Sequence, residues 1–378
     1  MKLLFFANTD WYLYNFRLPL ARAVRERGGE VVLISPPGDF GSRFAREGFR
    51  WISVPMDRRS LGLGSESRLV AHLVALYRKE RPALAHHFTI KSVVYGSVAA
   101  QIAGVRCRVN AVTGMGHVFT KNTWFTRAIR PAVMGLLRIA LRGKNSRLIV
   151  QNGDDLRFFV DRSLVDPARV RLIRGSGVSI ERFRPAARAP LASTERLRVL
   201  MASRVLWDKG VAEYIEAARI LRTRAVPVEL LLAGTPDSGN PASVPPNVIA
   251  AAHESGLINA LGFVHDMALL LSSVDVAVLP SYREGTPRGL LEAAACGLPI
   301  VATDVPGCRE VVDPGGNGML VPPRDGLALA DAIQFLAEHG AERVRMGQAG
   351  REKAVRHFDE KIVLRETLNV YRELVALA

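Results

Sequence analysis

Short apolar runs alternate with amphipathic stretches along the whole chain, and this alternation limits the possible folds more than any other feature. Strands of the first half are predicted at KLLFFA, EVVLIS, RWISVP, ALAHH, CRVNAV, RLIVQ and RVRLIR, with helices such as RLPLARAVRERG and SESRLVAHLVALYRKE between them. Strands of the second half are predicted at RLRVLMAS, VELLLAG, ALGFV, VDVAVLPS, LPIVATD and GMLVPP. Such alternation is typical of parallel sheets covered by helices, so the sequence predicts an α/β fold.

The alternation occurs twice, which predicts two domains. A chain of 378 residues is longer than one hydrophobic core usually supports. Gly and Pro interrupt the pattern in RGSGVSIERFRPAARAP, at 174–190. We therefore predict doubly wound domains over residues 1–180 and 181–357, followed by a terminal amphipathic helix over 358–378. Ligands of such sheets bind at the carboxyl ends of the strands, so we expect both domains to face a common cleft.

Composition places the chain among ordinary globular proteins of a reducing compartment. It is 48% hydrophobic and 23% charged, and its three cysteines, Cys107, Cys296 and Cys308, have no CxxC spacing. The start MKLLFFANTD has too short an apolar run for a signal peptide, and no window of about 20 residues is free of charge. We therefore expect a cytoplasmic location, no zinc site and no membrane-spanning segment.

The net charge of +15 is concentrated in the first half of the chain. Residues 1–185 hold 31 Lys and Arg against 13 Asp and Glu, whereas residues 186–378 hold 20 against 23. No acidic residue stands between Glu80 and Asp154. A field of one sign indicates a polyanionic partner: a nucleic acid, an anionic membrane surface or a diphosphate. The alternative is a general bias towards arginine, but such a bias should affect both halves.

The stretch REGTPRGLLEAAACGLP, at 283–299, is predicted to form a loop followed by a short apolar helix. Thr286 is a suitable N-cap and Pro287 suits the first helical position. Gly297 ends the helix. The helix follows the buried strand VDVAVLPS, so its N-terminus lies at a strand's carboxyl end and offers a site for phosphate. Gly285 lets a ligand approach the backbone there.

Two glutamates accompany this predicted anion site. Glu284 stands beside it and Glu292 lies about two turns into the helix. A carboxylate accepts two hydrogen bonds side by side, which matches the vicinal hydroxyls of a ribose or a hexose, so each glutamate could serve one sugar of a nucleotide-sugar. The alternative is a surface pair of Arg288 with Glu292, which would contribute only a few tenths of a kcal/mol. The apolar neighbours favour burial, and a buried charge needs a specific partner.

The block REGTPRGLLEAAACGLPIVATDVPGCREVV, with its Glu-x7-Glu spacing, resembles the signature of the family-4 retaining glycosyltransferases. The resemblance implies the GT-B fold: two Rossmann-like domains that face a central cleft, with the last helix returning to the N-terminal domain. It also implies that Glu292 holds the ribose of the donor nucleotide and that Glu284 contacts the donor sugar. The backbone of Gly285 and Thr286, next to Pro287, would lie against the sugar and the diphosphate.

Two cations supply the second part of the predicted donor site. The stretch ASRVLWDKGVAEYIEAARIL places Arg204 at a strand end and Lys209 at the start of the next helix, where they could clamp a diphosphate and stabilise it as a leaving group. The alternative is a lysine that caps a helix or is solvated. In the family, this arginine and lysine bind the donor diphosphate, and a segment like LGFVHDMALLL meets the base through its backbone, here around Val264. The sequence has no Asp-x-Asp, so no metal is expected.

The first domain is expected to hold the acceptor. ANTDWYLYNFRLPLARAV, HHFTIKSVVYG and NAVTGMGHVF form three strand–loop–helix corners. Arg17, Lys91 and His117 are the polar side chains predicted to reach an anionic acceptor, with Gly116 beside His117. GMGHVF only half matches a dinucleotide glycine fingerprint, and a lone histidine is more often structural than functional.

These first-domain segments, with SRVLWDKGV, resemble bacterial transferases that add N-acetylgalactosamine or a related hexose to undecaprenyl-diphospho-sugars. In that context TWFTRAIRPAVMGLLRIALRGK, at 123–144, is predicted to be a basic amphipathic helix that lies in an anionic membrane interface. The apolar side is predicted to consist of Trp124, Phe125, Ile129, Val133, Leu136 and Leu137. The alternative is a helix whose apolar side faces the core.

The sequence and the resemblance together predict a retaining, metal-independent enzyme that needs no cofactor. It would move a hexose (GalNAc, GlcNAc, Gal or Glc) from a UDP-sugar to a polyprenyl-diphosphate-linked sugar, in bacterial surface-glycan or glycoprotein assembly on the inner face of the cytoplasmic membrane. The enzyme alternatives are transfer to a soluble acceptor, and an epimerase or phosphorylase on the same scaffold. A basic nucleic-acid-binding protein is the alternative outside the enzymes, but the sequence has no recognised nucleic-acid module, so no nucleic-acid partner is expected.

Overall fold

The computed structural model describes residues 1–57, 62–115, 119, 124–186, 196–237 and 239–376. Its contacts divide the chain into two compact units, Met1–Ser176 with Val363–Ala378, and Gly177–Ile362. The divisions predicted from the sequence fall after residues 180 and 357. Each unit is built on a parallel sheet.

The first unit contains a seven-stranded parallel sheet in the order β3-β2-β1-β4-β5-β6-β7. The strands are β1 Lys2–Phe6, β2 Glu30–Ser35, β3 Arg50–Ser53, β4 Leu84–Phe88, β5 Cys107–Val112, β6 Ser146–Val150 and β7 Val170–Leu172. The helices are α1 Asp10–Tyr12, α2 Leu18–Arg25, α3 Arg43–Arg46, α4 Leu63–Glu80, α5 Ile90–Ile102, α7 Trp124–Ala140, α8 Gly153–Asp161 and most of α16 Glu360–Ala376, with a π-helical turn at Leu13–Arg17 and a 3-10 turn at Pro167–Arg169. Every strand predicted in this half is confirmed.

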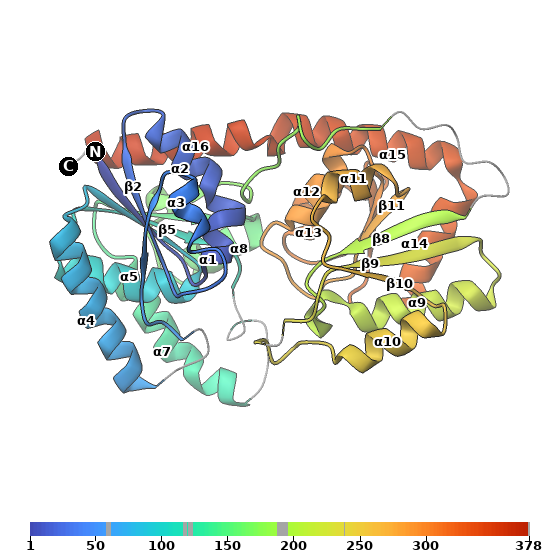
Figure 1. Cartoon of the computed structure of the whole chain (residues 1–378), viewed down its shortest axis with the longest axis horizontal. Coiled ribbons are helices and arrows are strands. Elements are labelled where there is room, and N and C mark those ends of the chain that lie inside the picture. The colour runs from blue at the N-terminus through green and yellow to red at the C-terminus, as the bar shows by residue number, and fades with distance from the viewer. Residues whose placement is uncertain (58–61, 116–118, 120–123, 187–195, 238, 377–378) are drawn as a thin grey trace. The chain divides into compact units, whose positions relative to one another are not determined.

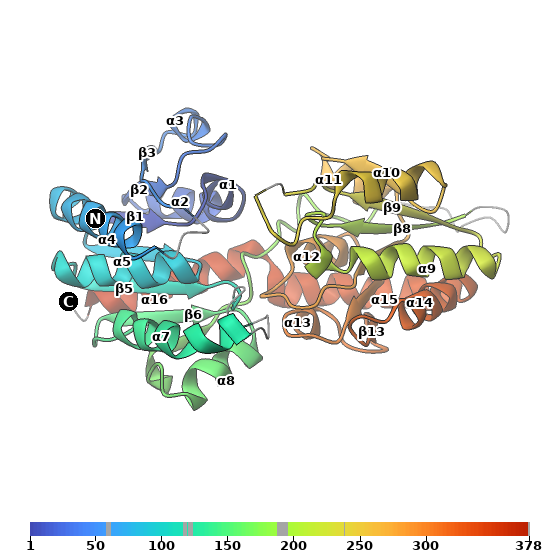
Figure 2. The same cartoon turned by 90° about the horizontal axis from the view of Figure 1, so that it is seen from below.

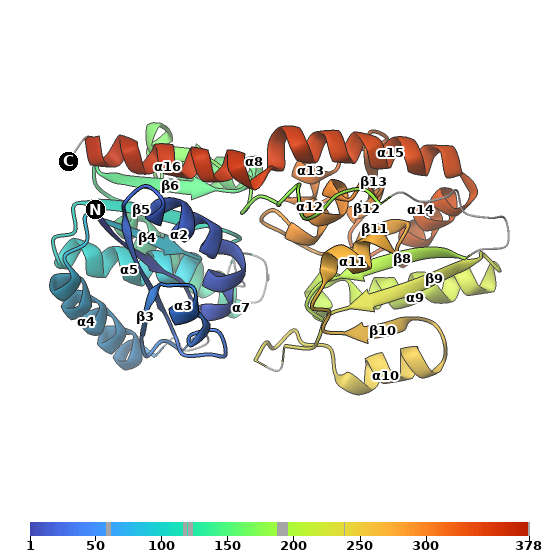
Figure 3. The ribbon, with the colours of Figure 1, turned by 45° about the horizontal axis from the view of Figure 1, so that its top comes forward.

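Alternate residues of the strands of the first unit enter different cores. Leu3 and Phe5 of β1 pack in a core with α2 and α16, whereas Leu4 and Phe6 pack in one with α4 and α5. Figure 1 shows α4 and α5 beside the sheet, and Figure 3 shows α16 running along it. Tyr371 of α16 is buried in the first of these cores. The terminal helix is therefore an integral part of the first unit.

The second unit contains a six-stranded parallel sheet in the order β10-β9-β8-β11-β12-β13. The strands are β8 Leu197–Ala202, β9 Val228–Ala233, β10 Asn259–Gly262, β11 Val276–Leu279, β12 Ile300–Thr303 and β13 Gly318–Val321. The helices are α9 Val211–Thr223, α10 Pro246–Glu254, α11 Met267–Ser272, α12 Arg288–Ala295, α13 Cys308–Val311, α14 Gly326–Glu338 and α15 Gly340–Lys353, with a 3-10 turn at Trp207–Lys209 and a π-helical turn at Ala354–Phe358. The strands predicted in this half are confirmed as well.

Helices cover both faces of the second sheet. Val199 and Met201 of β8 pack in a core with α9 and α14, and Leu200 packs in the opposite core with α11 and α12. Figure 2 shows α9 and α12 beside the strands. The strand order changes direction between β8 and β11 in this unit, and between β1 and β4 in the first. Ligands of open α/β sheets bind at the carboxyl ends of the strands at such switch points.

Candidate active site

The loops after β8, β11 and β12 meet at the carboxyl edge of the second sheet. The amide of Tyr282 donates to the carbonyl of Asp208 over 3.0 Å, which joins the loops after β11 and β8. The amide of Glu284 donates to the carbonyl of Pro306 over 3.3 Å, which joins the loops after β11 and β12. The loop after β11 is thus held between the other two, at the switch point between β8 and β11.

Two glycines allow these loops to approach one another closely. Gly210 has a φ of 81°, and a Cβ there would lie 2.1 Å from the carbonyl oxygen of Pro280. Gly307 has a φ of 84°, and a Cβ there would lie 2.2 Å from the carbonyl oxygen of Gly285. Both positions need a left-handed backbone and no side chain, so only glycine fits.

We expect Gly307→Ala to destabilise the second unit by about 2–4 kcal/mol, because the new methyl group must displace backbone at a disfavoured φ. Gly315→Ala is the matched control: the φ of Gly315 is 72°, but nothing lies within 4 Å of the position that a Cβ would take there. Only the backbone strain of about 1–2 kcal/mol then applies. Urea unfolding measures both free energies, and equal losses in the two variants would contradict a tight contact at Gly307.

Lys209 and Glu284 form an ion pair that joins the loops after β8 and β11. Nζ of Lys209 donates to Oε1 of Glu284, and the two side chains are only 19% and 11% exposed. Lys209 ends the 3-10 turn before α9, and Glu284 lies in the loop that leads into α12. The structure therefore brings together two of the three residues predicted to be catalytic.

Arg204 lies on the same loop as Lys209 but has a different partner. Its Nη1 donates to Oδ2 of Asp237 over 2.9 Å, and its side chain is 47% exposed. Arg204 and Lys209 are thus each paired with a different carboxylate. That both bind one diphosphate stays a prediction. The sequence reasoning missed Asp237, because it follows β9 and no local pattern connects it to Arg204.

The helix α12 starts one residue later than predicted and ends as predicted. Its N-cap is Pro287, with φ of −73° and ψ of 111°. This extended ψ keeps Pro287 out of the helix, so the prediction of Thr286 as the N-cap, with Pro287 as the first helical residue, was wrong. Cys296 is the C-cap, and the φ of 73° at Gly297 confirms the predicted stop. The positive end of the helix dipole accordingly lies just after the loop that contains Glu284.

Glu292 of α12 is largely buried and paired. Nε of Arg288 donates to its Oε1 over 2.9 Å, and the Glu292 side chain is 13% exposed. Burial raises the pKa of the Glu292 carboxyl, and the positive charges of Arg288 and Arg182 oppose the increase. The Arg288–Glu292 pair does form, but the carboxylate of Glu292 is largely buried and is not a surface group. Arg182 was missed because it lies far from Glu292 in the sequence.

The remaining predicted donor residues surround the same edge of the sheet. Gly285 and Thr286 lie in the loop between β11 and α12, with the carbonyl of Gly285 against Gly307. Val264 follows β10 and packs against the core that contains Leu290 of α12. Their contacts with a donor stay predictions.

Arg17 is close to the switch point of the first unit but is buried. It ends the π-helical turn after β1 and is 6% exposed. Its Nη2 donates to the hydroxyl of Tyr12 over 2.6 Å, and its guanidinium lies 4.7 Å from the centre of the Phe88 ring. This position serves the packing of the first unit, and contact with an acceptor stays a prediction.

Lys91 lies at the start of α5 and is paired as well. Its Nζ donates to Oε1 of Glu66 on α4 over 2.8 Å. Gly116 and His117, the other two residues predicted to bind the acceptor, lie outside the described residues. An acceptor role for Lys91, Gly116 and His117 therefore stays a prediction.

The basic helix predicted over 123–144 is α7, and its apolar residues divide between two sides. Leu137 is fully buried and Val133 packs against the same core, whereas Trp124 and Leu136 are 81% and 42% exposed. The prediction that these residues share one side was wrong, because neighbours such as Leu136 and Leu137 are separated by about 100° around a helix. The core-facing alternative holds for one side of α7 only.

Two kinds of feature do not occur in the described part of the chain. No group of three or more His, Cys, Asp or Glu side chains there could hold a metal ion. No helix of the same residues is long and apolar enough to cross a membrane.

Two family models match the chain. The model for glycosyl transferase 4-like proteins matches residues 2–152, and the model for glycosyl transferases group 1 matches residues 196–339. The second match includes the loops after β8, β11 and β12. The resemblance based on the Glu-x7-Glu block is thereby confirmed.

Curated relatives span nearly the whole chain. The N,N'-diacetylbacillosaminyl-diphospho-undecaprenol alpha-1,3-N-acetylgalactosaminyltransferase of Campylobacter jejuni is 26% identical over 384 residues, which cover 99% of each chain. The UDP-Gal:alpha-D-GlcNAc-diphosphoundecaprenol alpha-1,3-galactosyltransferase of Escherichia coli is 27% identical over 315 residues, which cover 81% of this chain and 79% of that one.

Solved structures share the fold. Sucrose-phosphate synthase of Thermosynechococcus elongatus aligns with a TM-score of 0.82 at 22% identity, over 100% of both chains. The Anabaena protein HepE in complex with UDP aligns with a TM-score of 0.78 at 20% identity, over 99% of this chain and 100% of that one. The predicted GT-B fold class is confirmed by these likenesses.

Proposed function

Because the chain belongs to the group 1 glycosyltransferases, we propose that it transfers a hexose from a UDP-sugar to a polyprenyl-diphosphate-linked sugar in bacterial glycan assembly. The names of the C. jejuni and E. coli relatives support this acceptor class, and that of the E. coli enzyme supports a UDP-sugar donor. The observation that carries the proposal is a cluster at one edge of the second sheet: the Lys209–Glu284 pair, the start of α12 and the buried Glu292.

In the proposed reaction, the donor diphosphate lies at the N-terminus of α12 and the nucleoside ribose donates its hydroxyl hydrogen bonds to Glu292. Negative charge grows on the diphosphate as its bond to the anomeric carbon breaks. Lys209, Arg204 and the helix end stabilise that charge. Glu284 keeps Lys209 in place through their ion pair. In the proposed complex Glu284 also contacts the donor sugar.

We propose that transfer retains the anomeric configuration and needs no metal. Leaving-group stabilisation and positioning then carry most of the catalysis. The two side-chain cations and the dipole of α12 supply the positive charge at the diphosphate that a metal ion would otherwise provide.

The test is a panel of UDP- and GDP-sugars assayed with a short polyprenyl-diphospho-sugar. We expect UDP to be released only when a UDP-sugar and this acceptor are both present, at a rate unchanged by EDTA, with an axial product linkage from an axial donor in the NMR spectrum. UDP release without acceptor, conversion of the donor sugar without UDP release, or transfer only to free sugars would each contradict the proposal.

A further inference from the structure

The helix α7 presents an apolar stripe to solvent along most of its length. We call this stripe the exposed α7 face; it consists of Trp124, Ala128, Pro131, Ala132, Leu136 and Ile139. Their spacing places them on one side of the helix. Trp124, Leu136 and Ile139 are 81%, 42% and 48% exposed, while Leu137 and Ala140 on the other side are buried. An exposed apolar surface of this kind marks an interaction site.

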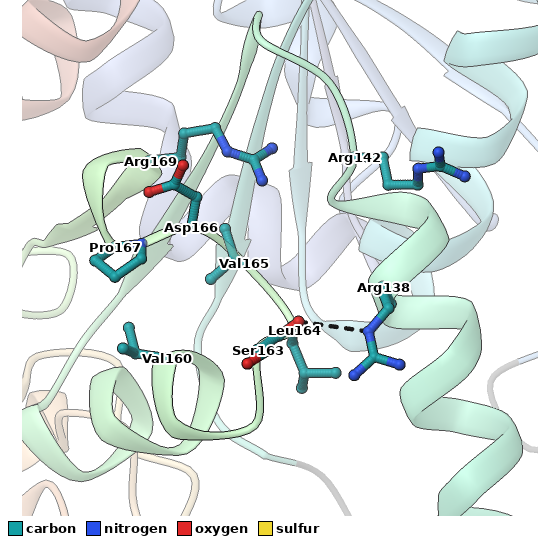
Figure 4. A pocket seen from close by; sticks show the side chains of 9 residues that line it. All are labelled: Arg138, Arg142, Val160, Ser163, Leu164, Val165, Asp166, Pro167 and Arg169. Carbon is teal, nitrogen blue, oxygen red and sulfur yellow. Dashed lines mark hydrogen bonds between the residues drawn. The ribbon is translucent and has the colours of Figure 1, made fainter.

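A basic pocket lies at the C-terminal end of α7. This arginine pocket, of about 410 Å³, is lined by Arg138, Arg142 and Arg169, by Asp166, and by Val160, Ser163, Leu164, Val165 and Pro167. Figure 4 shows Arg138 on α7, Arg142 just beyond the C-terminal end of that helix, and Arg169 across from them on the turn before β7. Because Arg138 is an exposed residue of α7 that borders the exposed α7 face, the pocket adjoins that face.

Backbone carbonyls, rather than carboxylates, hold two of these guanidinium groups. Arg138 donates to the carbonyl of Ser163 over 3.4 Å, and Arg169 donates to those of Leu141 and Gly143 over 3.0 Å each. Such bonds orient the side chains without cancelling their charge, which lowers the entropy cost of binding an anion.

Arginine side chains often cap the last carbonyls of a helix, and such capping would explain the hydrogen bonds of Arg138 and Arg169. It would not explain the presence of Arg142. Among the described residues, no ion pair joins any of the three arginines to a carboxylate, and the Arg142 side chain has no hydrogen-bond partner. Asp166 is the single acidic residue of the lining, and its Oδ1 accepts the amide of Ala168 over 2.9 Å. Three positive charges and one negative charge leave the pocket with a net charge of +2.

We propose that the arginine pocket binds the phosphodiester of an anionic glycerophospholipid while the exposed α7 face enters the interfacial region of the membrane. The apolar stripe and the adjoining cations match the two parts of such a lipid, its acyl chains and its charged headgroup. The inference rests on the proposed function, because a lipid-linked acceptor is what would require the protein to bind a membrane.

The pocket is separate from the part of the first unit where an acceptor is expected. α7 follows β5 and precedes β6 in the chain, so it runs from the carboxyl edge of the sheet to the amino edge. The pocket lies at the far end of the helix, next to the turn that leads into β7. It therefore anchors the first unit without occupying the switch point between β1 and β4.

Vesicle cosedimentation tests the proposal on the full chain. We expect binding to vesicles of phosphatidylcholine with 30% phosphatidylglycerol, and little binding to phosphatidylcholine alone. Arg142→Glu should lower the partition coefficient by about 10-fold or more, because it replaces an attraction by a repulsion at the headgroup. The control is Arg219→Glu, the same charge reversal at an exposed position of α9 in the second unit, which should change it by less than about 2-fold.

Two further variants separate a specific pocket from a diffuse basic surface. Asp166→Asn keeps an acceptor for the amide of Ala168 but removes the negative charge. It should therefore strengthen vesicle binding by several-fold, about as much as the loss of one basic residue would weaken it. Leu136→Ser with Ile139→Ser should weaken binding without any change of charge. Headgroup binding in the arginine pocket would be contradicted if Arg142→Glu and Arg219→Glu lowered the partition coefficient equally. It would also be contradicted if Asp166→Asn did not raise it.

The source of the phosphate is tested with soluble probes. Glycerol phosphate and inorganic phosphate should compete with vesicles only weakly, because they lack the acyl chains. Saturable binding of inorganic phosphate together with no binding to anionic vesicles would overturn the lipid assignment. Arg142→Glu should also turn over a short water-soluble acceptor at the wild-type rate. If the wild type binds vesicles as expected but transfers no sugar, the proposed function fails and the headgroup site stands.

Discussion

Replacing Lys209 by alanine is expected to lower turnover by about 10²-fold or more while the fold survives. The ammonium group lies at the edge where the diphosphate is proposed to leave, held against Glu284 between the loops after β8 and β11. Charge that develops only as the bond breaks is stabilised by this group, so kcat should fall more than the donor KM rises. Arg204→Ala is expected to lose turnover on the same scale. Steady-state rates at saturating donor measure both effects.

The matched control is Lys353→Ala. Lys353 is a lysine of the second unit that is similarly shielded, with a side chain 17% exposed, and that also forms an ion pair, with Asp313 over 2.8 Å. It lies at the end of α15, away from the loops after β8 and β11. This variant should keep kcat within about 2-fold, because Lys353 belongs to none of the loops that form the proposed donor site. Near-wild-type turnover of Lys209→Ala would contradict its role at the leaving group.

Glu292→Gln is expected to raise the donor KM by about 10- to 100-fold with a smaller change in kcat, as a hydrogen bond that involves a charged group is lost. A carboxylate accepts from both hydroxyls of a ribose, whereas an amide offers one acceptor. The substitution also removes the negative partner of the Arg288 guanidinium. Initial rates over a range of donor concentrations, with circular dichroism to check the fold, measure the effect.

The pH dependence of the donor KM gives an independent readout of Glu292. Burial raises the pKa of this carboxyl, so it loses its charge as the pH falls, and at a higher pH than an exposed glutamate does. The wild-type donor KM should therefore rise on acidification, and Glu292→Gln should flatten that rise. The control is Glu342→Gln, which removes a glutamate–arginine pair on an exposed helix surface. The same KM in both variants would contradict a ribose contact at Glu292.

Local patterns predict the strands and the position of the donor loops well, because each depends on residues adjacent in the chain. The strand VDVAVLPS, the loop with Glu284 and the stop at Gly297 all appear in the structure. The start of α12 was off by one residue, since the ψ of Pro287 depends on how its loop is held between two others. Proline permits both the extended and the helical ψ, so composition alone does not decide between them.

Long-range partners were not predictable in the same way. Asp237 beside Arg204, and Arg182 near Glu292, come from segments distant in sequence, and their pairing depends on how the strands are ordered. The apolar residues of α7 lie on two sides of the helix, because neighbouring residues of a helix are separated by about 100°. Leu136 and Leu137 show the consequence: one is exposed and the other is in the core.

The position of the donor nucleotide can be seen in a crystal structure with bound UDP. We expect the diphosphate at the N-terminus of α12, within hydrogen-bond distance of Nζ of Lys209, and the ribose hydroxyls donating to the carboxylate of Glu292. A nucleotide bound at another edge of the second sheet, or a ribose out of reach of Glu292, would contradict it.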